Sequence, residues 1–258
     1  RDRDVTGVQT CALPIFRRLR LSADAQAAGD RLDLMSLTRE QIQSGWVQKM
    51  AQEAGHSMKV LTEEELAQSR RETMACAPSK DVWVFGYGSL IWNPGFPHTE
   101  RVPARMVGLH RSLCVYSFVH RGTPEKPGLV LGLDRGGACR GIAYRVMAKQ
   151  RTETLAYLRA REQATSVYLE RVRTAWLAGK PEKPVQAVCY VVDRSHRQYA
   201  GRLSIHEQAH IVRQGHGGSG NNREYVLETV NALETLGMRD RELHLLAERL
   251  KGASDHTA

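Results

Sequence analysis

A tyrosine and a serine stand between and beside two glycines directly after an apolar run, and this group could hold a small anion. The chain reads Asp81-Val82-Trp83-Val84-Phe85 and continues into Gly86-Tyr87-Gly88-Ser89-Leu90-Ile91-Trp92. Glycine lets the backbone approach a ligand and turn its N–H groups toward it, and Ser89 adds a hydroxyl. The alternative is an ordinary glycine-rich turn after a strand, because short glycine motifs also occur by chance.

Two histidines further along the chain are spaced as a pair of zinc ligands. They bracket a glutamate in His206-Glu207-Gln208-Ala209-His210, and on a helix both would share one face. His216 follows at the spacing of a third ligand in extended zinc-hydrolase motifs. Arg213 stands where that longer motif needs glycine, however, and its cation would lie close to the metal. We therefore expect solvated surface histidines and no metal site, with a zinc hydrolase kept as an alternative.

The predicted strands come first along the chain and the predicted helices mainly later, and these elements must position the residues named above. Runs of β-branched and aromatic residues predict strands, and spaced apolar residues predict helices. Strands are expected within residues 82–144, 168–176 and 186–193, with turns at 93–95, 121–128, 134–137 and 178–181. Helices are expected over residues 152–161, 204–213, 221–236 and 241–251. This order favours an α+β fold, a small mixed barrel-like sheet packed by helices.

Three segments divide the chain. Residues 5–15 look like a translated sequencing-adapter oligonucleotide, so we expect residues 1–34 to be an artefactual or disordered leader. Residues 35–80 show helical spacing and are expected to form an N-terminal helical extension. The break at Cys76-Ala77-Pro78-Ser79 then opens a main domain over residues 81–251.

Composition narrows the class of protein. The chain has 258 residues, 41% of them hydrophobic and 25% charged, which is typical of a globular protein. Its formal charge is +9, but the basic residues are dispersed and only 6% of residues are aromatic, so we expect no nucleic-acid partner. No apolar run is long enough to cross a membrane. The five cysteines include no C-x-x-C pair, which favours reduced thiols in the cytoplasm, with Cys114 and Cys189 buried and inert.

Several segments, taken in order, resemble the γ-glutamylcyclotransferases, and Tyr87 to Trp92 has the form found in their glutathione-specific, ChaC-like branch. The other similar segments are His120-Arg121-Gly122-Thr123-Pro124, Pro127-Gly128, Gly141 to Arg145, Tyr157-Leu158-Arg159-Ala160-Arg161-Glu162, Val191 to His196, Tyr199-Ala200-Gly201, Gly218 to Asn221, and Glu224-Tyr225. Each is weak alone, but their common order over residues 81 to about 250 is specific. The resemblance implies a γ-glutamylcyclotransferase-like fold.

The resemblance also implies site residues. Glu162 matches the catalytic glutamate of the family, and as the end of a helix it would face the negative end of the helix dipole, which disfavours ionisation. An exposed glutamate paired with Arg159 or Arg161 is the alternative, and Glu170 and Glu125 are competitors. Tyr225 matches a tyrosine whose hydroxyl reaches the substrate, although Val226 replaces the usual leucine. The implied substrate-binding residues are Gly86, Tyr87, Gly88, Ser89, Leu90, Ile91 and Tyr225.

The implied activity is that of a lyase which converts glutathione into 5-oxoproline and cysteinylglycine. The α-amine of the γ-glutamyl group would attack its own side-chain amide, with Glu162 as base and then acid and with loop N–H groups holding the anionic parts. Both reacting groups belong to one molecule, so we expect neither cofactor nor metal, and we expect a monomer. Other γ-glutamyl amines or dipeptides as substrates, and a non-catalytic γ-glutamyl-binding regulator, are further alternatives.

Overall fold

A computed structural model of the chain describes residues 64, 71, 81–163, 165–179 and 181–252. The expected leader and nearly all of the expected helical extension therefore lie outside the described residues. Glu64 and Arg71 are the two positions before residue 81 that the structure describes, and both are helical and exposed.

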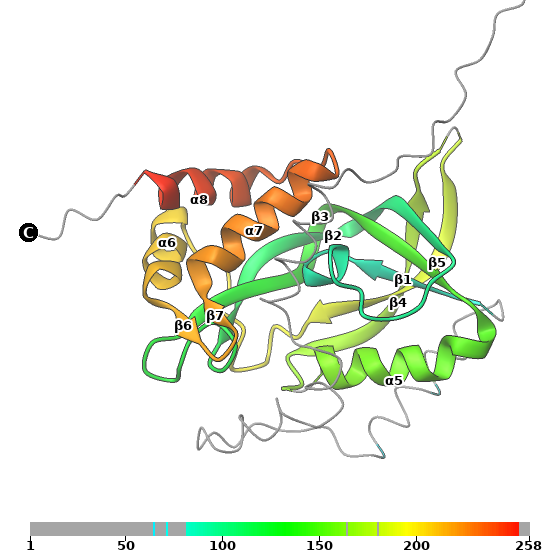
Figure 1. The fold of residues 1–258 in the computed structure, drawn as a ribbon, viewed down its shortest axis with the longest axis horizontal. Helices are drawn as coiled ribbons and strands as arrows, with labels where there is room; N and C mark the ends of the chain where they lie inside the picture. Colours follow the sequence, from blue (N-terminus) through cyan, green and yellow to red (C-terminus); the bar gives the residue numbers. More distant parts are fainter. Residues whose placement is uncertain (1–63, 65–70, 72–80, 164, 180, 253–258) are drawn as a thin grey trace, which may run out of the picture.

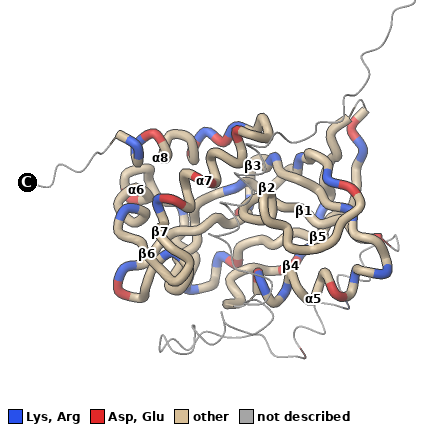
Figure 2. The backbone as a smooth tube through the Cα atoms, viewed as in Figure 1, with Lys and Arg blue, Asp and Glu red and all other residues tan. Residues whose placement is uncertain are grey.

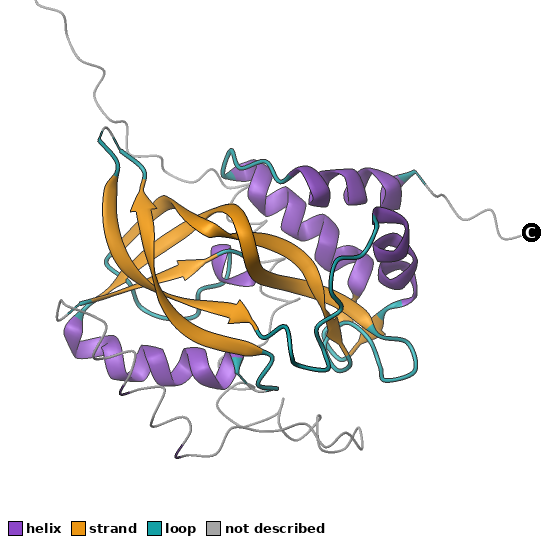
Figure 3. Ribbon diagram, turned by 180° about the vertical axis from the view of Figure 1, so that it is seen from behind, coloured by secondary structure: helices purple, strands orange, loops and turns teal. Residues whose placement is uncertain are grey.

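Five strands form a closed barrel (Figures 1 and 3). They are β1 (Val82–Gly86), β2 (Glu100–Ser117), β3 (Gly128–Val146), β4 (Tyr168–Leu177) and β5 (Lys183–Val192). Their order is β1-β3-β2-β4-β5, and a parallel pairing of β1 with β5 closes the circle. The sequential neighbours in this order pair antiparallel, so the barrel is mixed. The predicted α+β fold with a small mixed barrel is thereby confirmed.

The expected turn at residues 134–137 is wrong. β3 passes straight through this segment, and β2 pairs with it along almost its whole length. The register shifts between Val107 and Leu109, where Gly136 and Gly137 both have positive φ, 105° and 62°. The glycines thus form a bulge that bends a long hairpin, because the same left-handed conformations that build turns also build bulges. The expected turn at 121–128, by contrast, does join the two strands.

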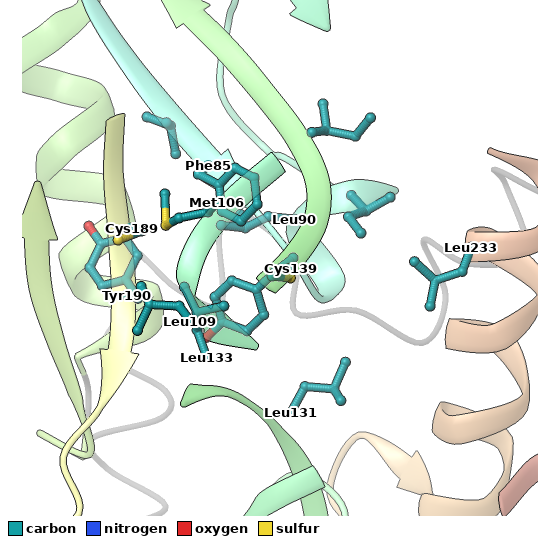
Figure 4. Packing of buried hydrophobic residues seen from close by; sticks show 14 of the residues in the cluster. Phe85, Leu90, Met106, Leu109, Leu131, Leu133, Cys139, Cys189, Tyr190 and Leu233 are labelled. Atoms are coloured by element: carbon teal, nitrogen blue, oxygen red, sulfur yellow. The ribbon is translucent and has the colours of Figure 1, made fainter. Parts of the chain in front are cut away.

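The interior of the barrel is filled by large apolar side chains from its strands. Phe85, Met106 and Tyr190 gather there, and Leu233 approaches the barrel from a helix (Figure 4). Tyr144 is fully buried as well. Its hydroxyl donates a hydrogen bond to the carbonyl of Leu90 at 2.8 Å, so burial does not leave this polar group without a partner. This bond fixes the segment after β1 against β3.

Helices lie on two sides of the barrel (Figures 1 and 3). α5 (Arg151–Glu162) runs along one side, and α6 (Ile205–Gln214), α7 (Asn222–Thr235) and α8 (Arg241–Lys251) pack together on another. Side chains of Ser204, Asn221 and Asp240 cap α6, α7 and α8, which explains where these helices begin. All four predicted helices are confirmed, with ends that differ by one residue or so.

Short elements complete the described chain: the 3₁₀ turns η1 (Ser89–Ile91) and η2 (Ala148–Gln150), and the two-residue strands β6 (His216–Gly217) and β7 (Gly220–Asn221). Basic and acidic residues are interspersed along the backbone (Figure 2). None of the helices in the described part of the chain combines the length and the apolar character that a membrane span requires.

Candidate active site

A cavity of about 180 Å³ opens where seven segments of the chain converge. These are the loop after β1, the β2–β3 connection, the start of β3, the end of α5, the start of β4, the turn between β6 and β7, and the first part of α7. The residues that line it are Tyr87, Gly88, Ser89, Leu90, Trp92, His120, Arg121, Val130, Leu131, Arg161, Glu162, Tyr168, Ser219, Tyr225 and Glu228. The structure therefore brings together Glu162, Tyr225 and the four consecutive residues 87–90, from three distant parts of the sequence.

The loop after β1 borders the cavity, and three of its backbone N–H groups have no hydrogen-bond acceptor among the described residues. Among the hydrogen bonds of the described residues, none uses the N–H of Gly88, Ser89 or Leu90 as donor. The carbonyl of Tyr87 accepts from the buried Nε of Arg111 at 2.5 Å, which holds the loop in place. Three donors in a fixed loop can receive an anion without reorganisation.

Two of the implied substrate-binding residues do not line this cavity. Gly86 ends β1, and a Cβ at its position would lie 3.0 Å from the Cβ of Leu90, so glycine is needed there for the tight turn. Ile91 is 1% exposed and belongs to the hydrophobic core. Both residues shape the loop from behind, and neither borders the cavity that we identify as the candidate site.

Glu162 ends α5 and faces the cavity with a side chain that is 15% exposed. Its Oε1 lies 3.2 Å from Nε of Arg161. Burial raises the pKa of this carboxyl, and the neighbouring Arg161 cation opposes part of the rise. Glu162 is thus not the exposed surface residue of the alternative interpretation, although it does pair with Arg161. A carboxylate with a raised pKa inside a cavity is suited to accept and return a proton.

The two competing glutamates have other surroundings. Glu170 has a fully buried side chain, pairs with Arg159 of α5 at 2.5 Å, and accepts a hydrogen bond from Tyr190 at 2.9 Å. Glu125 lies exposed in the β2–β3 connection. Neither borders the cavity. Glu170 has the environment of a structural ion pair.

Two tyrosine hydroxyls meet at the backbone of Leu131. Tyr225 accepts a hydrogen bond from the Leu131 N–H at 3.3 Å, and Tyr168 donates to the Leu131 carbonyl at 2.7 Å. Burial raises the pKa of both tyrosines, so both hydroxyls stay protonated. The proton of Tyr225 then remains available to a ligand, as do the lone pairs of Tyr168. The guanidinium of Arg121 lies 5.2 Å from the ring centroid of Tyr225 and steadies that ring.

Several residues of the cavity had no role predicted for them from the sequence. Burial lowers the pKa of His120 to about 4, so its ring is neutral, and its Nδ1 lies 3.1 Å from the hydroxyl of Ser219. Arg121 donates to the carbonyl of Ser219 at 2.5 Å. His120, Arg121 and Ser219 lie in segments that resemble the family, and this resemblance was the one sequence feature that could have pointed to them as site residues. Tyr168 had no such signal.

The spaced histidines occupy an ordinary capped helix. The carboxylate of Glu207 accepts from the N–H of Ser204 at 2.7 Å, which completes a capping box at the start of α6. His206 and His210 are exposed, and Nδ1 of His206 lies 3.0 Å from the guanidinium of Arg249. In the described part of the chain, no group of three or more His, Cys, Asp or Glu residues is arranged to hold a metal ion. Glu207 thus has a structural explanation.

This chain is similar to known proteins in sequence and in fold. A family model described as "ChaC-like protein" matches residues 82–253. The chain is 34% identical to the glutathione-specific γ-glutamylcyclotransferase of Escherichia coli (strain K12), over 73% of this chain and 81% of that protein. It is 32% identical to glutathione-specific γ-glutamylcyclotransferase 1 of Mus musculus, over 64% and 75%.

The fold is similar to that of a solved structure as well. A crystal structure of a γ-glutamylcyclotransferase specific to glutathione from yeast superposes with a TM-score of 0.63, at 23% identity, over 69% of this chain and 99% of that one. At this identity the likeness concerns the fold, and the family match rests on the sequence. The chain belongs to the ChaC-like family of γ-glutamylcyclotransferases.

Proposed function

We propose that this protein is a γ-glutamylcyclotransferase that converts glutathione into 5-oxoproline and cysteinylglycine. The observation that carries the proposal is the placement of a buried carboxylate, Glu162, in one cavity with the unpaired N–H groups of the loop after β1. The names of the relatives, which are glutathione-specific enzymes, support glutathione as the substrate.

The reaction exchanges one carbon–nitrogen bond for another. The α-amine of the γ-glutamyl group attacks the γ-carbonyl carbon, a new C–N bond closes the five-membered ring, and the amide bond to cysteine breaks. Glu162 takes a proton from the attacking nitrogen and returns it to the departing nitrogen of cysteinylglycine, so protons balance. The raised pKa of Glu162 suits both steps, because its conjugate acid forms readily and is a competent donor.

The cavity contains suitable groups for the rest of the γ-glutamyl moiety. The N–H groups of Gly88, Ser89 and Leu90 would receive either its α-carboxylate or the oxyanion that develops on the γ-carbonyl. The hydroxyl of Tyr225 would also donate a hydrogen bond to this anionic group, because no acceptor for its proton is found among the described residues.

A smaller cavity of about 80 Å³ adjoins the first and would hold the departing cysteinylglycine. Glu162 borders both cavities, which share five lining residues: His120, Val130, Arg161, Glu162 and Tyr168. Much of the smaller wall is apolar, with Val115 and Val167 among its residues. A carboxylate between two cavities can reach both nitrogens that exchange places in the reaction.

The test is incubation of the purified full chain with glutathione, followed by mass-spectrometric detection of 5-oxoproline and of cysteinylglycine. We expect both products in equal amounts, and none from the Glu162→Gln variant on the same timescale. Parallel incubations with γ-glutamyl dipeptides establish whether the enzyme prefers glutathione. If calorimetry detects glutathione binding but no substrate yields 5-oxoproline, the protein is a γ-glutamyl-binding regulator and the proposed activity is refuted.

We further propose that the enzyme is cytoplasmic and monomeric. Support for a reducing compartment comes from Cys114, Cys139 and Cys189, which are free and buried thiols. Light scattering on the purified protein tests the oligomeric state, and a dimer mass would refute the monomer.

A further inference from the structure

Arg161 lies where the loop, the helix and the carboxylate of the candidate site meet. Its Nη2 donates to the hydroxyl of Ser89 at 2.8 Å, and its Nη1 donates to the carbonyl of Asn93 at 2.7 Å. Nη1 also lies 3.2 Å from the hydroxyl of Tyr157, and Nε lies 3.2 Å from Glu162. The side chain is only 8% exposed. All three nitrogens of a buried guanidinium are thus occupied.

The shape of the guanidinium matters for what these contacts do. Its nitrogens are held in one plane, so fixing one of them on Glu162 fixes the direction of the other two toward Ser89 and Asn93. Ser89 begins the 3₁₀ turn that follows the cavity-lining Gly88, and Asn93 lies just beyond the end of that turn. A lysine ammonium at this position would supply the charge but could not bridge the same separated acceptors.

We propose that Arg161 is a positioning residue for the cyclotransfer reaction, whose guanidinium fixes the loop that receives the γ-glutamyl group relative to the carboxylate of Glu162. This inference rests on the proposed function. It also gives the guanidinium a second effect, because its positive charge is in direct contact with the carboxylate that must be ionised to act as a base.

The other groups that line the cavity around Glu162 do not duplicate that charge. Tyr87, Tyr168 and Tyr225 have raised pKa values and stay neutral, and the pKa of His120, lowered to about 4, keeps that ring neutral too. Among the charged residues of the cavity wall, Arg121 and Glu228 remain.

Arg121 is turned toward other partners. Its guanidinium contacts the Ser219 carbonyl and the ring of Tyr225. Arg161 is the cation that lowers the pKa of the Glu162 carboxyl, against the effect of burial. Removing this charge should therefore raise the pKa of Glu162, so the acid side of the activity profile should move to higher pH.

The experiment measures kcat and KM for glutathione as a function of pH in the full chain and in three variants. Arg161→Met removes both charge and bridge, Arg161→Lys keeps the charge, and Ser89→Ala removes one contact of the bridge. Arg173→Met, on an exposed arginine of β4 far from these contacts, is the matched control for loss of a positive charge.

We expect KM to rise about tenfold in all three site variants, which corresponds to one lost charged hydrogen bond. Only Arg161→Met should shift the acid side of the kcat/KM profile to higher pH, and the control should match the wild type in both quantities. If Arg161→Met does not fold, Arg161→Lys and Ser89→Ala still test the bridge through KM.

Two results would overturn the proposal. One is a wild-type KM in Arg161→Lys and Ser89→Ala. The other is a folded Arg161→Met variant whose pH profile coincides with that of Arg161→Lys. Failure of the proposed function is a separate outcome, since it would appear as the absence of glutathione turnover in the wild-type chain itself.

Discussion

Replacement of Glu162 by glutamine should lower the catalytic rate, whereas replacement of Glu170 by glutamine should lower the stability of the fold. Both side chains are largely withdrawn from water, but Glu162 borders the cavity and Glu170 pairs with Arg159 of α5. Glu162→Gln keeps the size of the side chain and removes the proton acceptor. General acid–base catalysis contributes a factor of about 10² to 10⁴ in rate, so we expect kcat to fall by that factor. This corresponds to an increase of about 3–5 kcal/mol in the activation free energy of the reaction.

Glu170→Gln should instead lower the stability of the fold. The side chains of Glu170 and Arg159 are 0% and 4% exposed, so the variant leaves an arginine cation buried without its counterion. Nε and Nη1 of Arg159 have no hydrogen-bond partner among the described residues, so little else can compensate. Breaking a buried ion pair costs about 3–5 kcal/mol. For a domain of this size that corresponds to a melting temperature lower by roughly 6–20 °C.

The assay pairs thermal unfolding, followed by circular dichroism, with 5-oxoproline formation at a temperature where each variant is folded. We expect Glu162→Gln to melt near the wild type with little activity, and Glu170→Gln to melt early while its folded fraction turns over normally. The reverse result, near-normal turnover in Glu162→Gln and a catalytic defect in well-folded Glu170→Gln, would transfer the base to Glu170 and refute the assignment.

Further expectations follow from the same site. Tyr225→Phe should raise KM and lower the free energy of unfolding by about 1–3 kcal/mol, because the buried Leu131 N–H loses its acceptor; steady-state kinetics and denaturant titration measure the two effects. As pH is lowered, kcat/KM should fall with a midpoint above pH 4.5, the ordinary pKa of a glutamate, because burial raises the pKa of Glu162 and only the ionised carboxylate is a base. A midpoint below pH 4.5 would contradict the assignment. The double variant His206→Ala, His210→Ala should keep full activity, and dialysis against a chelator should change nothing; activity lost on chelation and restored by zinc would favour the hydrolase alternative.

Part of this protein could be predicted from sequence because local patterns determined it. The strand that ends at Gly86 is mostly a run of β-branched and aromatic residues. The three C-terminal helices follow residues whose side chains are typical N-caps, namely Ser204, Asn221 and Asp240. Such features depend on residues a few positions apart. The function class came from the order of short segments that resemble a family, and the family match confirms it.

Other features were ambiguous locally and were decided by distant partners. Glycines with positive φ build a turn or a bulge equally well, and only the pairing of β2 with β3 makes Gly136 and Gly137 a bulge. Glu207 is a contrasting case: it stands between the two spaced histidines in sequence, and a contact only three residues away, the helix-capping hydrogen bond from the N–H of Ser204, accounts for it.

The composition of the cavity was also a matter of tertiary structure. Tyr168 carries no sequence signal, and its hydroxyl reaches the cavity because β4 passes beside Leu131 of β3. Glu162 and Glu170 are alike as residues, yet in the fold Glu170 is buried against Arg159 of α5 and Glu162 lies at a cavity wall. The sequence determined which ionisable groups the chain contains. The tertiary arrangement of α5 and the barrel decided how far each group is buried, and burial and nearby charge set its proton affinity.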